Sequence, residues 1–399
     1  MAAAKIARDA QMNKTIYLDN GSTTKVAPEV TKSMIPYFEE EYGNASTIHA
    51  KGVNAKQALE NSRKIIAKSI NALPEEIIFT SGGTESNNFA LKGTAFENKE
   101  KRHIITTKIE HSSVLNTCKW LESQGFEVTY LSVDKDGFID LNELKKSIKE
   151  KTILFSVIHA NNEIGTIQNL EEIGKICKQK KIYFHIDACQ SYTKVPIDVK
   201  KQNLDLVSLN AHKIHGPKGV GALYIKKATK ISSWQHGGSH ESHLRAGTEN
   251  VSAIVGFAKA VQITNSSHIK KMTELRDKLI SEVLKIPGTR LNGPQGDKRL
   301  CSNTDFSFDA IEGEAIVGFL DEAGIAASTG SACAEKNLDP SHVLKAIGLS
   351  HEQANGSLRL TLSRFTTEQE ICYAIQTLPE IVKKLRQFSP FGRELKNVL

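Results

Sequence analysis

The chain lacks any run of about 18 consecutive apolar residues, the length that a membrane-spanning helix requires. It also lacks an apolar core of signal-peptide length near its start, where MAAAKIARDAQMNK includes Asp9. We therefore expect a short, weakly ordered leader there and no secretory or transit peptide. These absences predict a soluble protein that does not interact with membranes.

Cysteine is scarce, and no two cysteines have the close spacing of a C-x-x-C motif. The six cysteines are Cys118, Cys177, Cys189, Cys301, Cys333 and Cys372. Because none forms a C-x-x-C pair, we expect neither a bound metal nor a disulfide framework, and a reducing, cytoplasmic compartment fits best. Cysteine usually fills apolar interiors, and we assign that role to Cys177 and Cys372.

Neither sign of charge dominates. The chain has 52 basic and 45 acidic residues, a net charge of +7, and the two signs are interleaved. This pattern favours a mixed, solvated surface over a nucleic-acid-binding one. A length of 399 residues exceeds what one hydrophobic core usually organises, so we expect two domains.

Short apolar runs alternate with helical patterns over residues 20–265, which is typical of an α/β domain with a mostly parallel sheet. The expected strands cover 77–80, 103–107, 152–159, 182–187, 204–209 and 221–225. Residues 141–149 and 170–179 have the apolar spacing of amphipathic helices. We place a smaller C-terminal domain at 266–399, starting with a long helix at 269–285, and expect residues 1–19 to pack against it.

One predicted strand leads into Ser81-Gly82-Gly83-Thr84, after which the apolar spacing becomes helical. Backbone N–H groups at the start of a helix, with hydroxyls beside them, favour a phosphate. The alternative is an ordinary glycine turn followed by a helix cap.

Two further strands end in reactive groups. Asp187 follows an apolar run, where a buried carboxylate must be paired or meet a cationic ligand such as a protonated pyridine nitrogen. Lys213 follows another run and lies between His212 and His215. If it is desolvated, its amine can form a Schiff base with an aldehyde. The alternatives are an internal ion pair for Asp187 and a solvated lysine, the role we expect for Lys218.

Polar residues also follow the other runs. His111 comes after the predicted strand 103–107, where an imidazole can stack on a ring or move a proton. In the second domain, Cys333 lies among small and polar residues, which suits a travelling thiolate nucleophile. NGSLRLTLSRF reads as a strand carrying Arg359 and Arg364, one of which can clamp a carboxylate, the alternative being a surface ion pair.

In this order, these segments resemble the cysteine desulfurases of the NifS/IscS-like group, in the class-V aminotransferase family of fold-type I pyridoxal-phosphate enzymes. The resemblance runs from YLDNGSTTKVAPEV to about residue 388 and rests on TSGGTESNN, TKIEH, HANNEIGTIQ, HIDACQS, AHKIHGPKGVGALY, LRAGTEN, GSAC and LSRFTTEQE. It implies a large domain whose seven-stranded, mostly parallel sheet lies between helices, and a smaller α+β domain that carries the catalytic cysteine.

The resemblance also implies roles around pyridoxal 5'-phosphate. Lys213 would hold the cofactor as a Schiff base, Asp187 would pair with the pyridine nitrogen, and His111 would stack on the ring. Asn162 and Gln190 would approach the phenolic oxygen.

On the phosphate side, the matching residues are Gly83, Thr84 and His212. Thr248 would come from the other subunit of a homodimer. Asn210 stands where the family usually has serine, so one phosphate hydrogen bond is expected to be rearranged.

For the reaction, the resemblance implies that Arg359 and Asn44 hold the carboxylate of L-cysteine. Cys333 would accept the sulfur as a persulfide while alanine leaves, and Lys213 and His111 would transfer protons. The sulfur would supply iron–sulfur cluster assembly, with tRNA thiolation as a further destination, through an acceptor protein that the sequence does not name.

Three alternatives stay open. A selenocysteine lyase would use the same cofactor, although GSAC weighs against it. An aminotransferase would need a 2-oxo acid and no Cys333. A catalytically silent partner protein of an assembly complex would bind no cofactor.

Overall fold

The protein is described here by a computed structural model, which covers residues 15–330 and 340–389. Its largest sheet has seven strands in the order β2-β8-β7-β6-β5-β3-β4. β8 is antiparallel to both neighbours, whereas the other four pairs are parallel. The strands are β2 (Ile77–Thr80), β8 (Gly221–Ile225), β7 (Leu206–Asn210), β6 (Tyr183–Asp187), β5 (Thr152–Ile158), β3 (His103–Thr107) and β4 (Glu127–Leu131). The predicted seven-stranded, mostly parallel sheet is confirmed.

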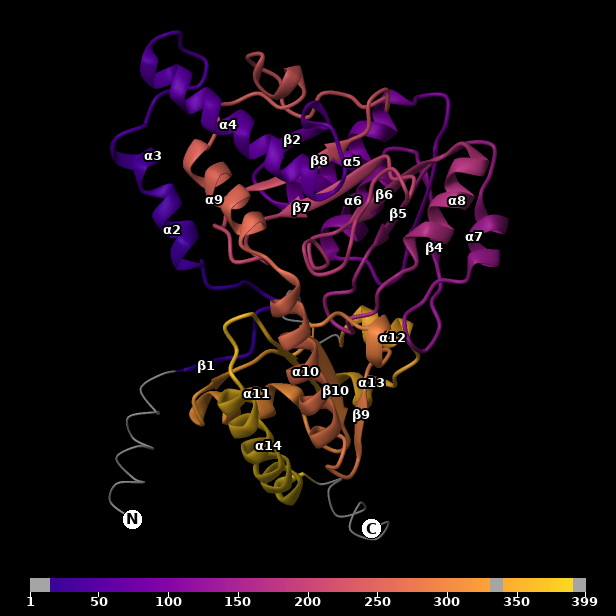
Figure 1. The fold of residues 1–399 in the computed structure, drawn as a ribbon. Helices are drawn as coiled ribbons and strands as arrows, with labels where there is room; N and C mark the ends of the chain where they lie inside the picture. The colour runs from indigo at the N-terminus through magenta and orange to yellow at the C-terminus, as the bar shows by residue number, and fades with distance from the viewer. Residues whose placement is uncertain (1–14, 331–339, 390–399) are drawn as a thin grey trace.

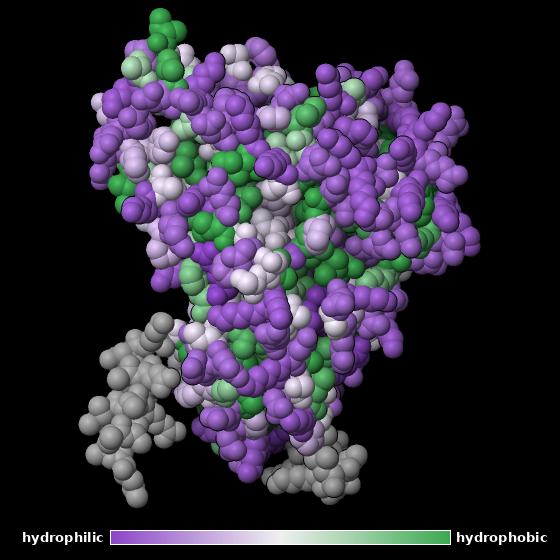
Figure 2. Space-filling view, in the orientation of Figure 1, coloured by the Kyte–Doolittle hydropathy of each residue, from purple (hydrophilic) through white to green (hydrophobic). Residues whose placement is uncertain are grey.

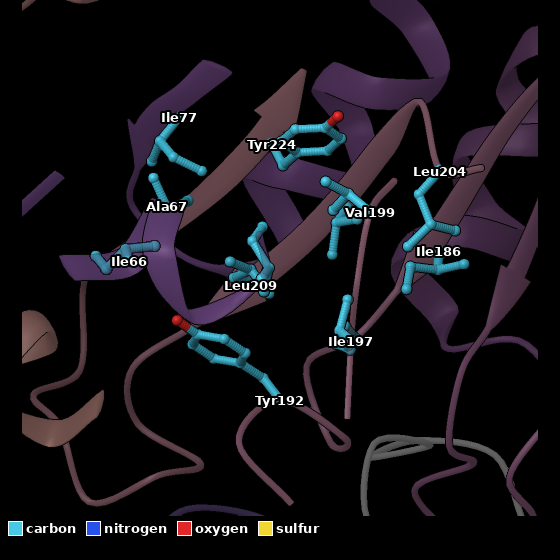
Figure 3. Close-up of a cluster of buried hydrophobic side chains, with 14 of the residues drawn as sticks. Ile66, Ala67, Ile77, Ile186, Tyr192, Ile197, Val199, Leu204, Leu209 and Tyr224 are labelled. Atoms are coloured by element: carbon cyan, nitrogen blue, oxygen red, sulfur yellow. The ribbon is translucent and has the colours of Figure 1, made fainter. Parts of the chain in front are cut away.

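Helices cover both faces of this sheet (Figure 1). They are α4 (Ala50–Ser69), α5 (Gly83–Glu97), α6 (Ser112–Ser123), α7 (Leu141–Ser147), α8 (Leu170–Lys180) and α9 (Val251–Gln262). Two short helices, α2 (Pro28–Met34) and α3 (Pro36–Glu39), pack against α9. Because successive strand residues point to opposite faces, Ile104 joins a core with α5 and α6, whereas Ile105 joins a core with α4, α8 and α9. Figure 3 shows the second of these cores, in which Ile66 of α4 lies near Leu209 of β7.

A second body lies below the large sheet in Figure 1 and has its own apolar core. Its antiparallel sheet has the order β12-β10-β9, and β1 pairs in parallel with β11. The strands are β1 (Ile16–Tyr17), β9 (Thr289–Leu291), β10 (Asn303–Phe308), β11 (Ile325–Ala326) and β12 (Ser357–Thr361). The helices are α10 (Ser266–Val283), α11 (Gly313–Glu322), α12 (His342–Ala346), α13 (His351–Asn355) and α14 (Glu368–Phe388). The domain boundaries near residues 19 and 265 stay predictions.

Three short 3₁₀ helices complete the described elements: η1 (Pro74–Glu76), η2 (His240–His243) and η3 (Gly296–Lys298). In residues 15–330 and 340–389, no helix has both the length and the apolar character that crossing a membrane requires. Hydrophilic side chains cover most of the face in Figure 2.

Residues 18–27 connect the two bodies. On one side, the Thr361 amide donates to the Leu18 carbonyl at 2.6 Å, and the Gly21 amide donates to Thr361 Oγ1 at 2.7 Å. On the other side, the Thr24 amide donates to the His212 carbonyl at 3.0 Å. The segment between these anchors, which contains Gly21 and Ser22, is therefore fixed against both bodies.

Predicted elements are confirmed with small changes at their ends. The helix predicted at 269–285 starts earlier, at Ser266, because the Asn265 side chain accepts from the His268 amide and caps it. The helix predicted at 141–149 ends at Ser147, where Ile148 is extended.

Two expectations in the second domain were wrong. Arg364 does not lie in a strand, because β12 ends at Thr361 and the Thr366 amide closes a turn onto the Ser363 carbonyl at 3.0 Å. Cys372 is only partly buried, and its sulfur accepts from the Lys278 ammonium of α10 at 3.3 Å, so it does not fill an apolar interior. Cys177 is buried, as predicted.

Candidate active site

A cavity of about 920 Å³ lies between the two bodies. The ends of β6 and β7 and the loops that follow β3, β5, β6 and β7 contribute His111, Asn162, Asp187, Gln190, Asn210, His212 and Lys213, and the start of α5 contributes Gly83 and Thr84. Arg359, on β12, lines the opposite side. Ligands of open α/β sheets bind at the carboxyl ends of the strands, and the cavity lies at that edge. Ten of the predicted site residues therefore meet in one place.

The amine of Lys213 is held away from bulk water. Its Nζ donates to the carbonyl of Gly21 and, at 2.7 Å, to that of Ser22. Burial, followed by the nearby Arg359 cation, lowers the pKa of Lys213 to about 8. An amine with such a pKa is partly neutral at pH 7 to 8 and can attack an aldehyde carbon. Lys218, five residues later, is exposed, as predicted.

Asp187 ends β6 and is 3% exposed. Its Oδ2 accepts from Asn87 Nδ2 at 2.7 Å and its Oδ1 from the Cys189 amide at 2.9 Å. Both donors are neutral, and no ion pair to Asp187 occurs within the described ranges. A buried carboxylate without a cationic partner fits a protonated ring nitrogen in the cavity.

A hydrogen-bonded chain joins Asp187 to His111. Asn87 Nδ2 also donates to Ser113 Oγ at 2.8 Å. The Ser113 amide donates to His111 Nδ1 at 3.1 Å, which leaves Nε2 to carry the proton of the neutral imidazole. Burial, the largest influence, lowers the pKa of His111. Sequence analysis missed Asn87 and Ser113, although Asn87 follows Thr84 by three residues on a predicted helix.

The start of α5 has the features of an anion site. Its N-cap, Gly82, has a φ of +155° and offers no side-chain acceptor to the first amides of the helix. A side chain on Gly83 would collide with Cys189 Sγ and would lie 3.6 Å from Asn210 Nδ2. Glycine is therefore required where the backbone comes close to the cavity, and Asn210 lies beside the predicted phosphate position.

His212 is also suited to bind an anion as a neutral hydrogen-bond donor. Its Nδ1 lies 3.2 Å from Thr23 Oγ1. Burial, the largest influence, and the neighbouring Lys213 cation lower the pKa of His212 to about 4. At neutral pH, the imidazole is therefore uncharged and can act as a hydrogen-bond donor to an anion without paying for a buried charge.

Arg359 is 4% exposed and already makes several hydrogen bonds. It donates to the Asn162 carbonyl at 3.1 Å and, from Nη2, to Asp19 Oδ1 at 3.1 Å and Ser22 Oγ at 2.9 Å. Its Nε is buried and has no partner. The guanidinium is thus held rigidly at the cavity wall.

Asn44 and Thr248 do not line this cavity. Their chain neighbours Ala45 and Glu249 line a different cavity of about 830 Å³. Asn44 Oδ1 accepts from the Ser46 amide at 2.8 Å. Their roles stay predictions, and that of Thr248 requires a second subunit. Cys333 lies outside the described residues.

Gln190 faces the cavity, and its Nε2 donates to the Gly21 carbonyl at 2.9 Å. This is the carbonyl that also accepts from Lys213. Gln190 therefore helps to fix the backbone that holds the reactive amine. Its predicted approach to a phenolic oxygen stays a prediction.

A buried carboxyl, Glu110, also lines the cavity and was missed by sequence analysis. Its Oε1 accepts from Thr107 Oγ1 at 2.6 Å and from the Ile158 amide at 3.0 Å, while Oε2 has no partner. Burial raises the pKa of Glu110 to about 8. The side chain is therefore a neutral acid at pH 7.

This raised pKa predicts how stability depends on pH. The folded protein keeps the Glu110 proton that the unfolded chain has lost, so this contribution is complete below about pH 4.5 and disappears as the pH rises through 8. Glu110→Gln cannot lose that proton. The free energy of unfolding is measured in urea for both proteins. The value for Glu110→Gln minus the value for the wild type should increase by about 1.4 kcal/mol for each pH unit from pH 5 to 8. Glu122→Gln, at an exposed position, should show no such trend. If the unfolding free energies of Glu110→Gln and the wild type change with pH in parallel, Glu110 does not keep its proton in the folded protein.

Comparison with known proteins agrees with this geometry. The aminotransferase class-V family model matches residues 16–373. The cysteine desulfurase IscS of Methanosarcina thermophila is 51% identical over 382 residues, covering 95% of this chain and 94% of that protein. A solved structure described as a NifS-like protein is 40% identical with a TM-score of 0.88, covering 93% of this chain and 100% of the other. A structure described as SspA in complex with cysteine is 39% identical with a TM-score of 0.80, covering 88% and 100%.

The chain therefore belongs to the class-V aminotransferase family, whose members include pyridoxal-phosphate enzymes. At 51% identity over nearly its whole length, it belongs within that family to the cysteine desulfurases. The predicted family is confirmed.

Proposed function

We propose that this protein is a pyridoxal-phosphate-dependent cysteine desulfurase that converts L-cysteine to L-alanine and transfers the sulfur to Cys333. The observation that carries the proposal is the shared cavity of Lys213, Asp187 and Arg359, which can serve as nucleophile, anion and carboxylate clamp. The selenocysteine lyase and aminotransferase alternatives have no observation of their own in their favour.

The cavity residues fit the cofactor. The Lys213 amine would bond to its aldehyde carbon, Asp187 would face the ring nitrogen, and the start of α5 would hold the phosphate. When bound, pyridoxal phosphate withdraws the electrons released at the amino-acid α-carbon. Asn87 Nδ2 donates to Asp187 Oδ2 and so would hold that carboxylate in place for the ring nitrogen.

The chain's own groups then have separate tasks. Arg359 would bind the substrate carboxylate and orient the amino acid in the cavity. Lys213 and His111 would move protons, since one has a pKa of about 8 and the pKa of the other is lowered by burial. The Cys333 thiolate would take the substrate sulfur: the substrate carbon–sulfur bond breaks, a sulfur–sulfur bond forms, and alanine leaves with the protons balanced and no added oxidant.

We also propose a homodimer. Ile48, Tyr42 and Phe38 are 98%, 70% and 63% exposed, which is unusual for large apolar side chains. They lie in the chain segment around Asn44, and Ile48 lines the cavity of about 830 Å³ that a second copy would complete. The sulfur of the Cys333 persulfide would then pass to an iron–sulfur scaffold or another sulfur-acceptor protein in the cytoplasm.

The proposal is tested with the purified full chain and L-cysteine in the absence of reductant. Peptide mass analysis should find a gain of about 32 daltons on Cys333, reversed by dithiothreitol. Cys333→Ala should show no such gain and no sustained alanine release, whereas Cys372→Ala should behave as the wild type. Full alanine release by Cys333→Ala, or a gain on another cysteine, would contradict the proposal.

A further inference from the structure

A buried carboxylate in the loop after β5 contacts residues on both sides of the segment 331–339. Glu163 is 5% exposed, and its Oε2 accepts from the Ser341 hydroxyl. A Cβ added to Gly330 would lie 2.9 Å from the same oxygen, so the Gly330 backbone is close to it. Gly330 and Ser341, which are 11 positions apart, are thus brought to one acceptor.

Ser341 transmits this contact to the cavity wall. Its Oγ accepts from the amides of Val343 and Leu344, at 3.1 and 3.2 Å, and caps α12. The first residue of α12, His342, lines the cavity, and its Nε2 lies 2.9 Å from the Glu110 carbonyl oxygen. The Ser341 hydroxyl thus gives its one proton to Glu163 and keeps its lone pairs directed at the two α12 amides, so Glu163 orients the cap.

A second buried carboxylate faces the same point. Asp305 is 0% exposed; its Oδ1 accepts from Asn292 Nδ2 at 2.7 Å. Its Oδ2 has no partner and would lie 3.3 Å from the Cβ added to Gly330. The two carboxylates therefore converge beside Gly330.

The charges around this pair do not neutralise both carboxylates. Arg359 and Arg299 are the cations that face them, but Arg359 already pairs with Asp19, at 3.1 Å, and Arg299 bonds to backbone carbonyls. Burial raises the pKa of Glu163 to about 7 and that of Asp305 to about 7. Near neutral pH, the pair therefore holds about one proton and avoids burying two anions.

We propose that Glu163 is a positioning residue for sulfur transfer. Together with Asp305, it holds Gly330, Ser341 and α12 against the cofactor cavity and so fixes the two points between which the chain carries Cys333. This inference deepens the proposed function and rests on it.

The test compares Glu163→Ala with Glu163→Gln, whose amide oxygen still accepts from Ser341. In the cofactor-loaded full chain, hydrogen exchange of the Val343 and Leu344 amides should be about tenfold faster in Glu163→Ala and within about threefold of wild type in Glu163→Gln. The kcat for alanine release should fall about tenfold in Glu163→Ala with little change in KM, and Glu163→Gln should restore it.

A matched pair of serine caps provides the control. Ser350→Ala removes the cap of the neighbouring helix α13, whose cap hydroxyl accepts from the Gln353 amide, and should leave α12 exchange and kcat unchanged. Ser341→Ala should reproduce the effects of Glu163→Ala.

Between pH 6 and 8, exchange of the α12 amides, corrected for the intrinsic pH effect, should increase in the wild type as the shared proton is lost, but not in Glu163→Gln or Asp305→Asn.

Unchanged α12 exchange in Glu163→Ala, or failure of glutamine to restore it, would overturn the inference. If Glu163→Ala does not fold, the pH series with Glu163→Gln decides, and a pH trend equal to that of the wild type rejects it. Because exchange is measured without turnover, it remains informative if the wild type forms no persulfide, so failure of the positioning role and failure of the proposed function are distinguishable.

Discussion

Lys213→Ala should lower kcat/KM for sulfide release from L-cysteine by about 10⁴-fold or more, even with excess pyridoxal phosphate. A positioned acid–base group alone contributes about 10²- to 10⁴-fold, and this amine is also the expected covalent attachment point of the cofactor. Burial lowers the pKa of this amine to about 8, and the alanine variant has no amine at this position. Sulfide and alanine should be measured together, and the protein's visible absorbance should be recorded after gel filtration.

Lys218→Ala is the matched control, because Lys218 is exposed and lies in the same loop. It should retain both the absorbance and the activity within about twofold, as surface substitutions usually do. Lys213→Ala should lose the absorbance of covalently held cofactor. Sulfide release by Lys213→Ala at the parental rate would refute the assignment of the reactive amine.

Asp187→Asn should lower kcat by about 10²- to 10⁴-fold. Removing one partner of a buried charge pair costs about 3–5 kcal/mol, and each 1.4 kcal/mol is a factor of about ten. The variant should still fold, because Asn87 Oδ1 is buried without a partner and can accept from the new amide after a flip of the Asn87 side chain. The loss should therefore appear in catalysis more than in stability.

The measurements for Asp187→Asn are steady-state kinetics, cofactor content and urea unfolding. Asp198→Asn is the control, since Asp198 also accepts backbone N–H bonds, from Lys200 and Lys201, but lies away from the cavity. It should change stability alone. A kcat for Asp187→Asn within about threefold of wild type, with full cofactor content, would show that this carboxylate does not act on the ring.

Local patterns were sufficient to predict six of the seven strands of the large sheet and the residues at their ends. Asp187 and Lys213 come directly after apolar runs, and strand ends in a parallel sheet share one edge, so their proximity was predictable. The edge strand β4 was not among the predicted strands, because only Leu131 of its five residues is buried and its apolar signal is weak.

Contacts between distant segments could not be predicted in this way. Glu163 and Ser341 are 178 positions apart, and no local pattern in either segment indicates the other. The partly buried Cys372 and the position of Arg364 after β12 likewise depend on how the second body packs. Asn87 is an intermediate case, since its helix was predicted but its bond to Asp187, 100 positions away, was not.

The short stretch between Leu18 and Thr24 has a consequence for engineering. It is anchored to Thr361 at one end and to His212 at the other, and between these anchors the carbonyls of Gly21 and Ser22 accept from Lys213. A lengthened or shortened connection there would shift the reactive nitrogen directly, together with the part of the cavity wall that Gly21 and Ser22 form. Library designs that vary linker length should therefore spare this stretch, however tolerant of change connecting segments usually are.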